Sequence, residues 1–174
     1  MEYEPKDIIV LGAIKRGKKK FDNIQKETKI EPEELNSILE KLEKREFIKV
    51  EEKKGWLGKK IEISVTDKGQ NELEQRLHEV QEKWNQMQLL YEGKDKQKLK
   101  NFMDDNRSFL PMMMFFGIMD IMMFSMMFSM IGATMTDYVP AESIPDGMDG
   151  ADGGDSMGDG GDMGDGGFDI DIGF

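Results

Sequence analysis

Helical spacing of apolar residues predicts three short helices in the first 45 residues. The first covers residues 8–14 and ends before a run of three lysines, the second lies within residues 21–30, and the third begins at Pro32. Proline suits the first turn of a helix because its missing N–H would have no partner there. The third helix has apolar residues at i, i+3, i+4 and i+7, namely Leu35, Ile38, Leu39 and Leu42.

Strand patterns follow these helices. Residues 47–50 (FIKV) and 61–65 (IEISV) are predicted to form two strands. The segment between them, EEKKGWLGKK (residues 51–60), contains two glycines and is predicted to be a loop. The order helix, helix, helix, strand, loop, strand predicts an α+β domain over residues 1–67.

A longer helix is predicted over residues 68–92. Its apolar residues alternate steps of four and three, which is a heptad seam: Leu73, Leu77, Val80, Trp84, Met87 and Tyr91. A seam of this length predicts a homodimer, and packing of the helix on its own domain is the alternative.

The net charge of the remaining chain differs from that of the first hundred residues. Residues 1–100 hold 23 Lys and Arg against 21 Asp and Glu, whereas residues 101–174 hold one Arg against 14 acids. Residues 94–135 are first polar and then methionine-rich and apolar, and they are predicted to be helical. Residues 136–174 hold 11 glycines and 11 acids with no basic residue. This tail is predicted to be disordered, because little apolar surface is present to offset chain entropy.

The acidic tail allows several interpretations. Its last eight residues, GFDIDIGF, alternate apolar and acidic side chains, a pattern that could add a strand to a partner. The Asp-Gly runs lack the spacing of an EF-hand or of a calcium-binding β-helix. The tail is therefore interpreted as an anionic solubiliser. A further hypothesis is that it screens the lysine-rich residues 51–60 by imitating phosphate.

The order of the elements, closed by SVTDKGQNELE, resembles the winged helix-turn-helix domain of MarR- and PadR-like transcription regulators over residues 6–90. In that family a strand enters a T-x-K-G turn that opens a helix, here Thr66 to Gly69. The end of the recognition helix is matched by Leu39, Leu42, Phe47 and Ile48. Glu46 stands where glycine is usual. The resemblance implies that the helix from Pro32 to Arg45 enters the major groove and that residues 51–60 form the wing.

Double-stranded DNA is therefore the predicted partner, and a dimeric DNA-binding transcription regulator is the predicted function. The candidate contacts on the recognition helix are Asn36, Ser37, Lys41, Lys44 and Arg45. Those on the wing are Lys53, Lys54, Trp56, Lys59 and Lys60, with a second basic patch at Lys18, Lys19 and Lys20. Residues 31–46 also contain six glutamates, which oppose phosphate contacts. The wing is thus better suited to DNA than the helix, and a protein-binding winged helix is the alternative.

Pro111 and Gly117 are predicted to break the apolar segment into a short piece and a longer helix. Methionines form a stripe along this longer helix, over residues 118–131. The stripe consists of Met119, Met122, Met123, Met126, Met127 and Met130. Unbranched thioethers repack around varied apolar shapes. The stripe resembles the methionine-rich domains of the signal recognition particle and of co-chaperones for tail-anchored membrane proteins. The alternative function is thus a chaperone-like binder of transmembrane or signal segments, with the winged helix as a docking module.

Three other interpretations of this apolar segment stay open. Residues 109–135 are long enough for a transmembrane anchor and are preceded by basic residues and followed by acids, although Pro111 and Asp120 interrupt them. The stripe could also be an oligomer core or pack on the long helix. Copper(I) binding by the thioethers is the last option.

Catalytic chemistry finds little support in the sequence. The chain has no cysteine and one histidine, His78, and it lacks a phosphate-binding glycine loop and a nucleophile elbow. No catalytic residue, metal or cofactor is predicted, and the protein is not expected to be an enzyme. The first residues, MEYEPKDIIV, lack the order of a secretory signal. The expected location is the cytoplasm, with membrane association if residues 109–135 form an anchor.

Overall fold

The structure is a computed structural model, and it describes residues 5–144. Three helices come first, α1 (Pro5–Lys15), α2 (Phe21–Thr28) and α3 (Pro32–Lys44). The strands β1 (Ile48–Gly55) and β2 (Gly58–Val65) form a hairpin, and the long helix α4 (Asp67–Glu92) follows. The remaining helices are α5 (Lys96–Asp105), α6 (Leu110–Phe115) and α7 (Ile121–Ile131), with 3-10 turns η1 (Arg107–Phe109), η2 (Met135–Asp137) and η3 (Ala141–Ser143). The α+β winged helix-turn-helix architecture with added C-terminal helices is confirmed.

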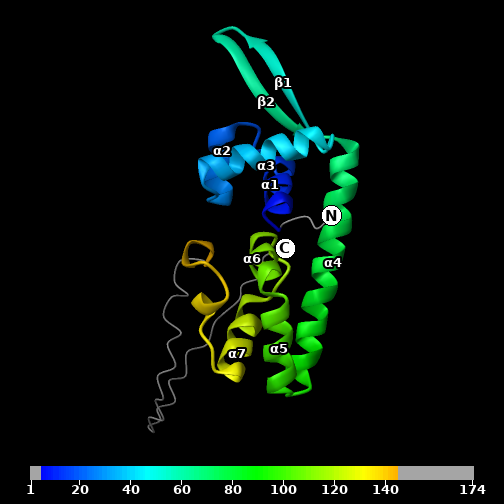
Figure 1. Cartoon of the computed structure of the whole chain (residues 1–174), viewed down its shortest axis with the longest axis vertical. Helices are drawn as coiled ribbons and strands as arrows, with labels where there is room; N and C mark the ends of the chain where they lie inside the picture. Colours follow the sequence, from blue (N-terminus) through cyan, green and yellow to red (C-terminus); the bar gives the residue numbers. More distant parts are fainter. Residues whose placement is uncertain (1–4, 145–174) are drawn as a thin grey trace, which may run out of the picture.

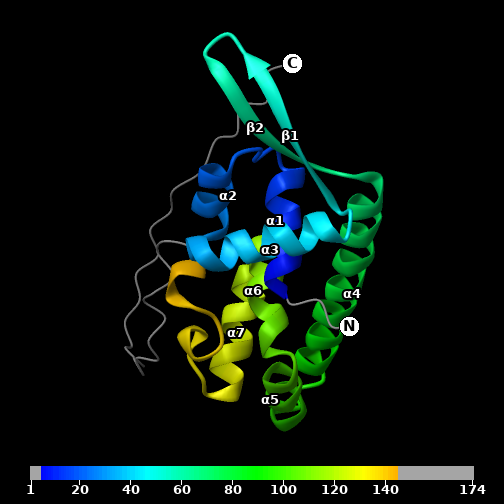
Figure 2. The same ribbon diagram turned by 45° about the horizontal axis from the view of Figure 1, so that its top comes forward.

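The hairpin and the C-terminal helices lie at opposite ends of the molecule (Figure 1). The hairpin projects beyond α1, α2 and α3, and α4 runs along the side of the molecule from the base of the hairpin to α5. Figure 2 shows α3 crossing in front of α1, with α6 continuing beyond α1 toward α5 and α7.

The hairpin is longer than the sequence predicted. The two strands of eight residues each pair antiparallel from Ile48↔Val65 to Gly55↔Gly58, so residues 51–60 are mostly strand rather than loop. Only Trp56 and Leu57 form the turn, and Gly58 beside them has φ 117°. The pattern missed this extension because its polar side chains are exposed, and alternation marks a strand only where one face is buried.

Helix α1 is buried on all sides rather than on one face. Every residue from Ile8 to Ile14 is buried, and α1 contacts α2, α3, α4, β2 and α6. A helix that is apolar all round must lie inside the protein. Helix α1 is therefore the centre around which both halves of the chain pack.

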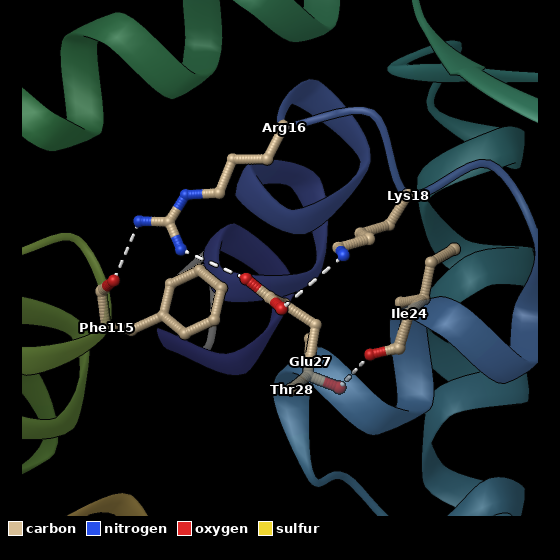
Figure 3. Close-up of polar contacts among 6 residues, drawn as sticks. All are labelled: Arg16, Lys18, Ile24, Glu27, Thr28 and Phe115. Atoms are coloured by element: carbon tan, nitrogen blue, oxygen red, sulfur yellow. Dashed lines mark hydrogen bonds and ion pairs between the residues drawn. The ribbon is translucent and has the colours of Figure 1, made fainter. Parts of the chain in front are cut away.

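The C-terminal half is attached to α1 through α6. The ring of Phe116 packs so closely on Gly12 that a Cβ there would lie 2.3 Å from a ring carbon. The Arg16 guanidinium lies over the ring of Phe115, 4.5 Å from its centroid, and donates from Nη2 to the Phe115 carbonyl at 2.8 Å. Arg16 also pairs with Glu27 on α2, and these contacts are drawn in Figure 3. Arg16 thus ties α1, α2 and α6 together.

The predicted seam of α4 faces its own chain. Leu73, Val80, Trp84 and Met87 are buried, and Leu77 and Tyr91 are partly buried against the same core. The Trp84 and Phe124 rings meet edge to face with centroids 6.3 Å apart. These side chains are covered without a second copy, and the dimer stays a prediction.

The apolar segment 109–135 forms short pieces. Gly117, at φ 64°, separates α6 from α7, as the sequence predicted. The Asp120 carboxylate caps α7 by accepting from the backbone N–H of Met122 and Met123 at 2.9 and 3.1 Å. Within residues 5–144, no helix is both long enough and apolar enough to cross a membrane.

The first nine residues of the predicted disordered tail, 136–144, pack on the body instead. Tyr138, Val139 and Ile144 are buried, and the Tyr138 hydroxyl donates to Asp104 at 2.6 Å. These few apolar residues pack against the C-terminal helices. The composition of the tail did not predict this packing. The rest of the tail, with the terminal GFDIDIGF, lies outside the described residues.

The turn between α3 and β1 explains two of the sequence motifs. Glu46 adopts φ 64°, the left-handed conformation that glycine tolerates best. The Thr66 side chain accepts from Gly69 N–H at 3.1 Å to cap α4 and donates to the Glu46 carbonyl at 2.6 Å. A Cβ on Gly69 would lie 2.1 Å from the Phe47 carbonyl oxygen. The T-x-K-G turn therefore joins the residues that follow α3 to the start of α4.

Replacing Glu46 with glycine should stabilise the protein by about 1 kcal/mol, because the left-handed conformation costs a side chain about that much. The Lys68–Glu46 ion pair that is lost is exposed and 3.6 Å long. The control, Glu43→Gly inside α3, should destabilise by about 1 kcal/mol. Urea unfolding checks both, and a loss of stability for Glu46→Gly would contradict the account of this turn.

Candidate nucleic-acid interface

Helix α3, the predicted recognition helix, presents a polar and largely acidic surface. Its apolar side, Leu35, Ile38, Leu39 and Leu42, is buried. Asn36 and Ser37 are exposed, and the Asn36 amide donates to Glu40 at 3.1 Å. Both candidates are accessible, but they lie among exposed glutamates that repel phosphate.

Lys41, a predicted DNA contact, forms an ion pair with a buried side chain of the protein itself. Its Nζ lies 2.8 Å from Oδ2 of Asp7, a carboxylate with no exposed surface in the first turn of α1. An ionised carboxylate at such depth needs a positive partner. Lys41 therefore holds α3 against α1, and this role competes with phosphate for its charge.

The last two candidates on α3 differ in exposure. Lys44 is exposed at the end of the helix. Arg45 is half-buried, and its carbonyl accepts from Lys68 Nζ at 2.9 Å. The accessible positive charge of α3 is thus at its C-terminal end, beside the base of the hairpin.

The four predicted wing lysines lie together near the tip of the hairpin. The register places Lys53 opposite Lys60 and Lys54 opposite Lys59, and directly opposite residues share a face of the sheet. Two glutamates offset part of this repulsion, with Lys53–Glu62 at 2.8 Å and Lys59–Glu52 at 3.5 Å. Among residues 5–144, no ion pair involves Lys54 or Lys60. The ammonium groups of these two lysines are therefore available to a binding partner.

The ion pairs shift the titration of the wing. The hydrogen bond and the nearby charge of Glu62 raise the pKa of Lys53, and the hydrogen bond from Lys53 lowers the pKa of Glu62. A hydrogen bond and the charge of Lys49 lower the pKa of Glu51. Each of these three shifts favours the charged form of its group near neutral pH.

Apolar side chains accompany these lysines. Trp56 and Leu57, the turn residues, are almost fully exposed, and Ile61 and Val50 are exposed on one face of the hairpin. Trp56 was predicted from the sequence, whereas Leu57 and Ile61 were missed. The GWLG turn signal could have indicated Leu57, because a two-residue turn leaves both of its side chains outside the sheet.

The second basic patch adjoins the wing. The backbone N–H of Ile63 donates to the Lys19 carbonyl at 2.9 Å, which places residues 18–20 at the base of the hairpin. Lys18 lies 3.9 Å from Glu27, which also pairs with Arg16 (Figure 3). Lys18, Lys19 and Lys20 therefore lie beside the base of the hairpin, and Glu51 and Glu62 lie between them and the lysines near its tip.

A model of the family described as HxlR-like helix-turn-helix matches residues 6–93, half of the chain. The chain belongs to the HxlR-like helix-turn-helix family. This match confirms the predicted winged helix-turn-helix and its general function as a DNA-binding transcription regulator, although the family differs from the MarR- and PadR-like ones named by resemblance. The match covers α1 to α4 and leaves the C-terminal helices outside it. No curated protein and no solved structure matches the chain.

The methionine stripe of this HxlR-like protein is divided between core and surface. Met119 and Met127 are buried, and Met123 and Met130 are partly buried. Met122 and Met126 are exposed by 69% and 50%, and the hydroxyl of Tyr91 donates to the Met126 sulfur at 3.5 Å. The six methionines therefore do not form one open face. Within residues 5–144, no three His, Asp or Glu side chains are grouped to hold a metal ion.

Replacing Lys41 with alanine should destabilise the protein by about 2 kcal/mol, because the buried Asp7 carboxylate would lose its partner. Lys44→Ala, the control on the exposed end of the same helix, should change stability by less than about 0.5 kcal/mol. Adding Asp7→Asn to Lys41→Ala should restore part of the loss. Equal unfolding midpoints for the two lysine variants would show that the ion pair is not structural.

Replacing Met127 with alanine should destabilise by about 2–4 kcal/mol, because the removed side chain leaves a cavity in the core. The matched change Met122→Ala, five residues away on α7, should cost less than about 0.5 kcal/mol. Thermal or urea unfolding compares them. Similar small losses at both positions would mean that α7 does not pack on the core through Met127.

Proposed function

We propose that this protein is a transcription regulator that binds double-stranded DNA chiefly through its wing. The observation that carries the proposal is the exposed Trp56–Leu57 turn, which lies between Lys54 and Lys59 at the tip of a hairpin that projects from the body. Lysines that contact phosphates provide most of the sequence-independent affinity for DNA. An aromatic side chain at the tip suits insertion into a groove.

Helix α3 has a smaller part in this proposal. Asn36 and Ser37 are the exposed polar groups that suit hydrogen bonds to base edges, and Lys44 suits a phosphate at the end of the helix. The exposed glutamates Glu33 and Glu40 keep this helix from approaching the backbone closely. Sequence readout by α3 is therefore modest, and the wing supplies the affinity.

A homodimer belongs to the same proposal, because helix-turn-helix regulators commonly read two half-sites as dimers. The seam of α4 is covered, so a second copy would need another surface. Leu89 on α4 and Met122 and Met126 on α7 are exposed and apolar. Two contacts, Gln88–Met123 and Tyr91–Met126, join these helices, which makes this region the candidate for the dimer contact.

The chaperone-like alternative gains no support from the packing. A groove for hydrophobic segments would need most of the stripe to be open, and Met119 and Met127 belong to the core. The cytoplasm is the location proposed for this regulator, in line with its family.

Replacing Lys54 and Lys60 with glutamine should weaken binding to any duplex about tenfold at low salt. It should also reduce the slope of log affinity against log salt by about 2, since each phosphate contact contributes about 1. Fluorescence anisotropy with two unrelated duplexes, across a salt series, measures both quantities.

The control changes the same charge far from the wing. Lys96 and Lys98 lie on α5 at the opposite end of the molecule, and the pair Lys96→Gln with Lys98→Gln should leave the slope unchanged. An equal loss of slope in both double variants would refute the wing as the phosphate-binding element.

A further inference from the structure

The wing exposes lysines and apolar side chains that have no partner in the described part of the chain. Its strands hold five lysines and three glutamates. Like charges directly opposite one another destabilise a hairpin, and here they occur twice, at Lys53–Lys60 and Lys54–Lys59. A negatively charged occupant would relieve this repulsion even when DNA is absent.

The two faces of the hairpin also differ in chemistry. One face carries the apolar side chains Val50, Ile61 and Ile63 together with Lys54 and Lys59, whereas the other face carries Lys49, Lys53 and Lys60. Trp56 and Leu57 add apolar surface at the tip. An occupant that matches the wing should therefore be acidic and should carry a few apolar side chains.

One segment of this chain has this composition. Residues 145–174 contain nine aspartates, no lysine and no arginine, and they end in FDIDIGF. In that ending, Phe168, Ile170 and Ile172 alternate with Asp169 and Asp171. We propose that residues 145–174 dock in cis on the wing and occupy the lysines that would bind phosphate.

The described chain ends at Ile144, close to the C-terminal end of α2. Ile144 is buried, and the neighbouring Glu142 carbonyl accepts from Lys29 at the C-terminal end of α2. From there α2 leads back to residues 18–20, where the Lys19 carbonyl bonds Ile63 at the base of the hairpin. The described chain thus ends on the side of α2, whose other end lies next to Lys18, Lys19 and Lys20.

The reach of the segment is sufficient. Helix α2 has eight residues, about 12 Å, and each strand has eight residues, about 26 Å. Thirty residues have an average end-to-end distance of about 30 Å and can extend to about 100 Å. The resulting effective concentration is of millimolar order, so weak contacts suffice for docking in cis.

Docking would regulate the wing by competition. This consequence rests on the proposed function, because the aspartates and the DNA phosphates would use the same lysines. The competition is electrostatic, so it weakens as salt increases. The acidic segment thus sets a threshold that a DNA site must exceed.

The test uses the full-length chain and the fluorescence of Trp56. Acrylamide quenching is measured for the native chain and for a variant with all nine tail aspartates changed to asparagine. The Trp56→Phe chain gives the contribution of the buried Trp84, which is subtracted. A matched control changes Met148, Met157 and Met163 to serine and keeps the tail charge. The same proteins are then titrated with a non-specific duplex.

The quenching of Trp56 should be about twofold weaker in the native chain than in the asparagine variant at low salt, as expected if the docked form predominates. The difference should vanish at about 1 M salt, where charges are screened. The serine control should behave like the native chain. The asparagine variant should bind DNA about tenfold more tightly at low salt. Equal quenching of the native chain and the asparagine variant at low salt would overturn the proposal.

The two readouts separate this inference from the proposed function. Protection of Trp56 without DNA binding by any variant would support docking and refute the DNA-binding wing. DNA binding by all variants with equally quenched Trp56 would refute docking and leave the proposed function intact.

Discussion

Burial of α1 is the constraint on which the rest of the structure depends. This helix is apolar on every side, and α2, α3, α4 and β2 leave part of it to be covered. Helix α6 covers that part, with Phe116 on Gly12 and the Arg16 guanidinium over Phe115. The apolar C-terminal segment therefore completes the core of the winged-helix domain, which explains its presence in a highly charged chain.

This packing places the hairpin at one end of the molecule and the C-terminal helices at the other. Helix α4 links the hairpin to the C-terminal helices. The residues of its predicted heptad seam pack against α7 through contacts such as Trp84–Phe124. Because the core needs nothing from the distal hairpin, residues 51–60 are free to carry charge and exposed apolar groups. The distal hairpin, which contributes least to the core, therefore exposes the lysines and apolar side chains that suit a binding partner.

Charge within the domain follows the same division. Lys41 neutralises the buried Asp7, and the exposed surface of α3 is dominated by glutamates. Positive charge that is available for a partner is concentrated along residues 18–20 and the hairpin, whereas negative charge is concentrated in residues 145–174. Opposite charges in one chain create competition between an internal and an external ligand for the same lysines.

The sequence by itself determined α1 to α4, the turn at Thr66–Gly69 and the break at Gly117, because helical periodicity, capping and glycine conformation act over a few residues. Only the tertiary structure decided the length of the hairpin, since its exposed polar strands carry no alternation. It also decided which methionines of α7 are buried, that Lys41 serves Asp7, and that Tyr138 belongs to the core. Each of these depends on a surface that residues distant in sequence supply, and no local pattern contains that information.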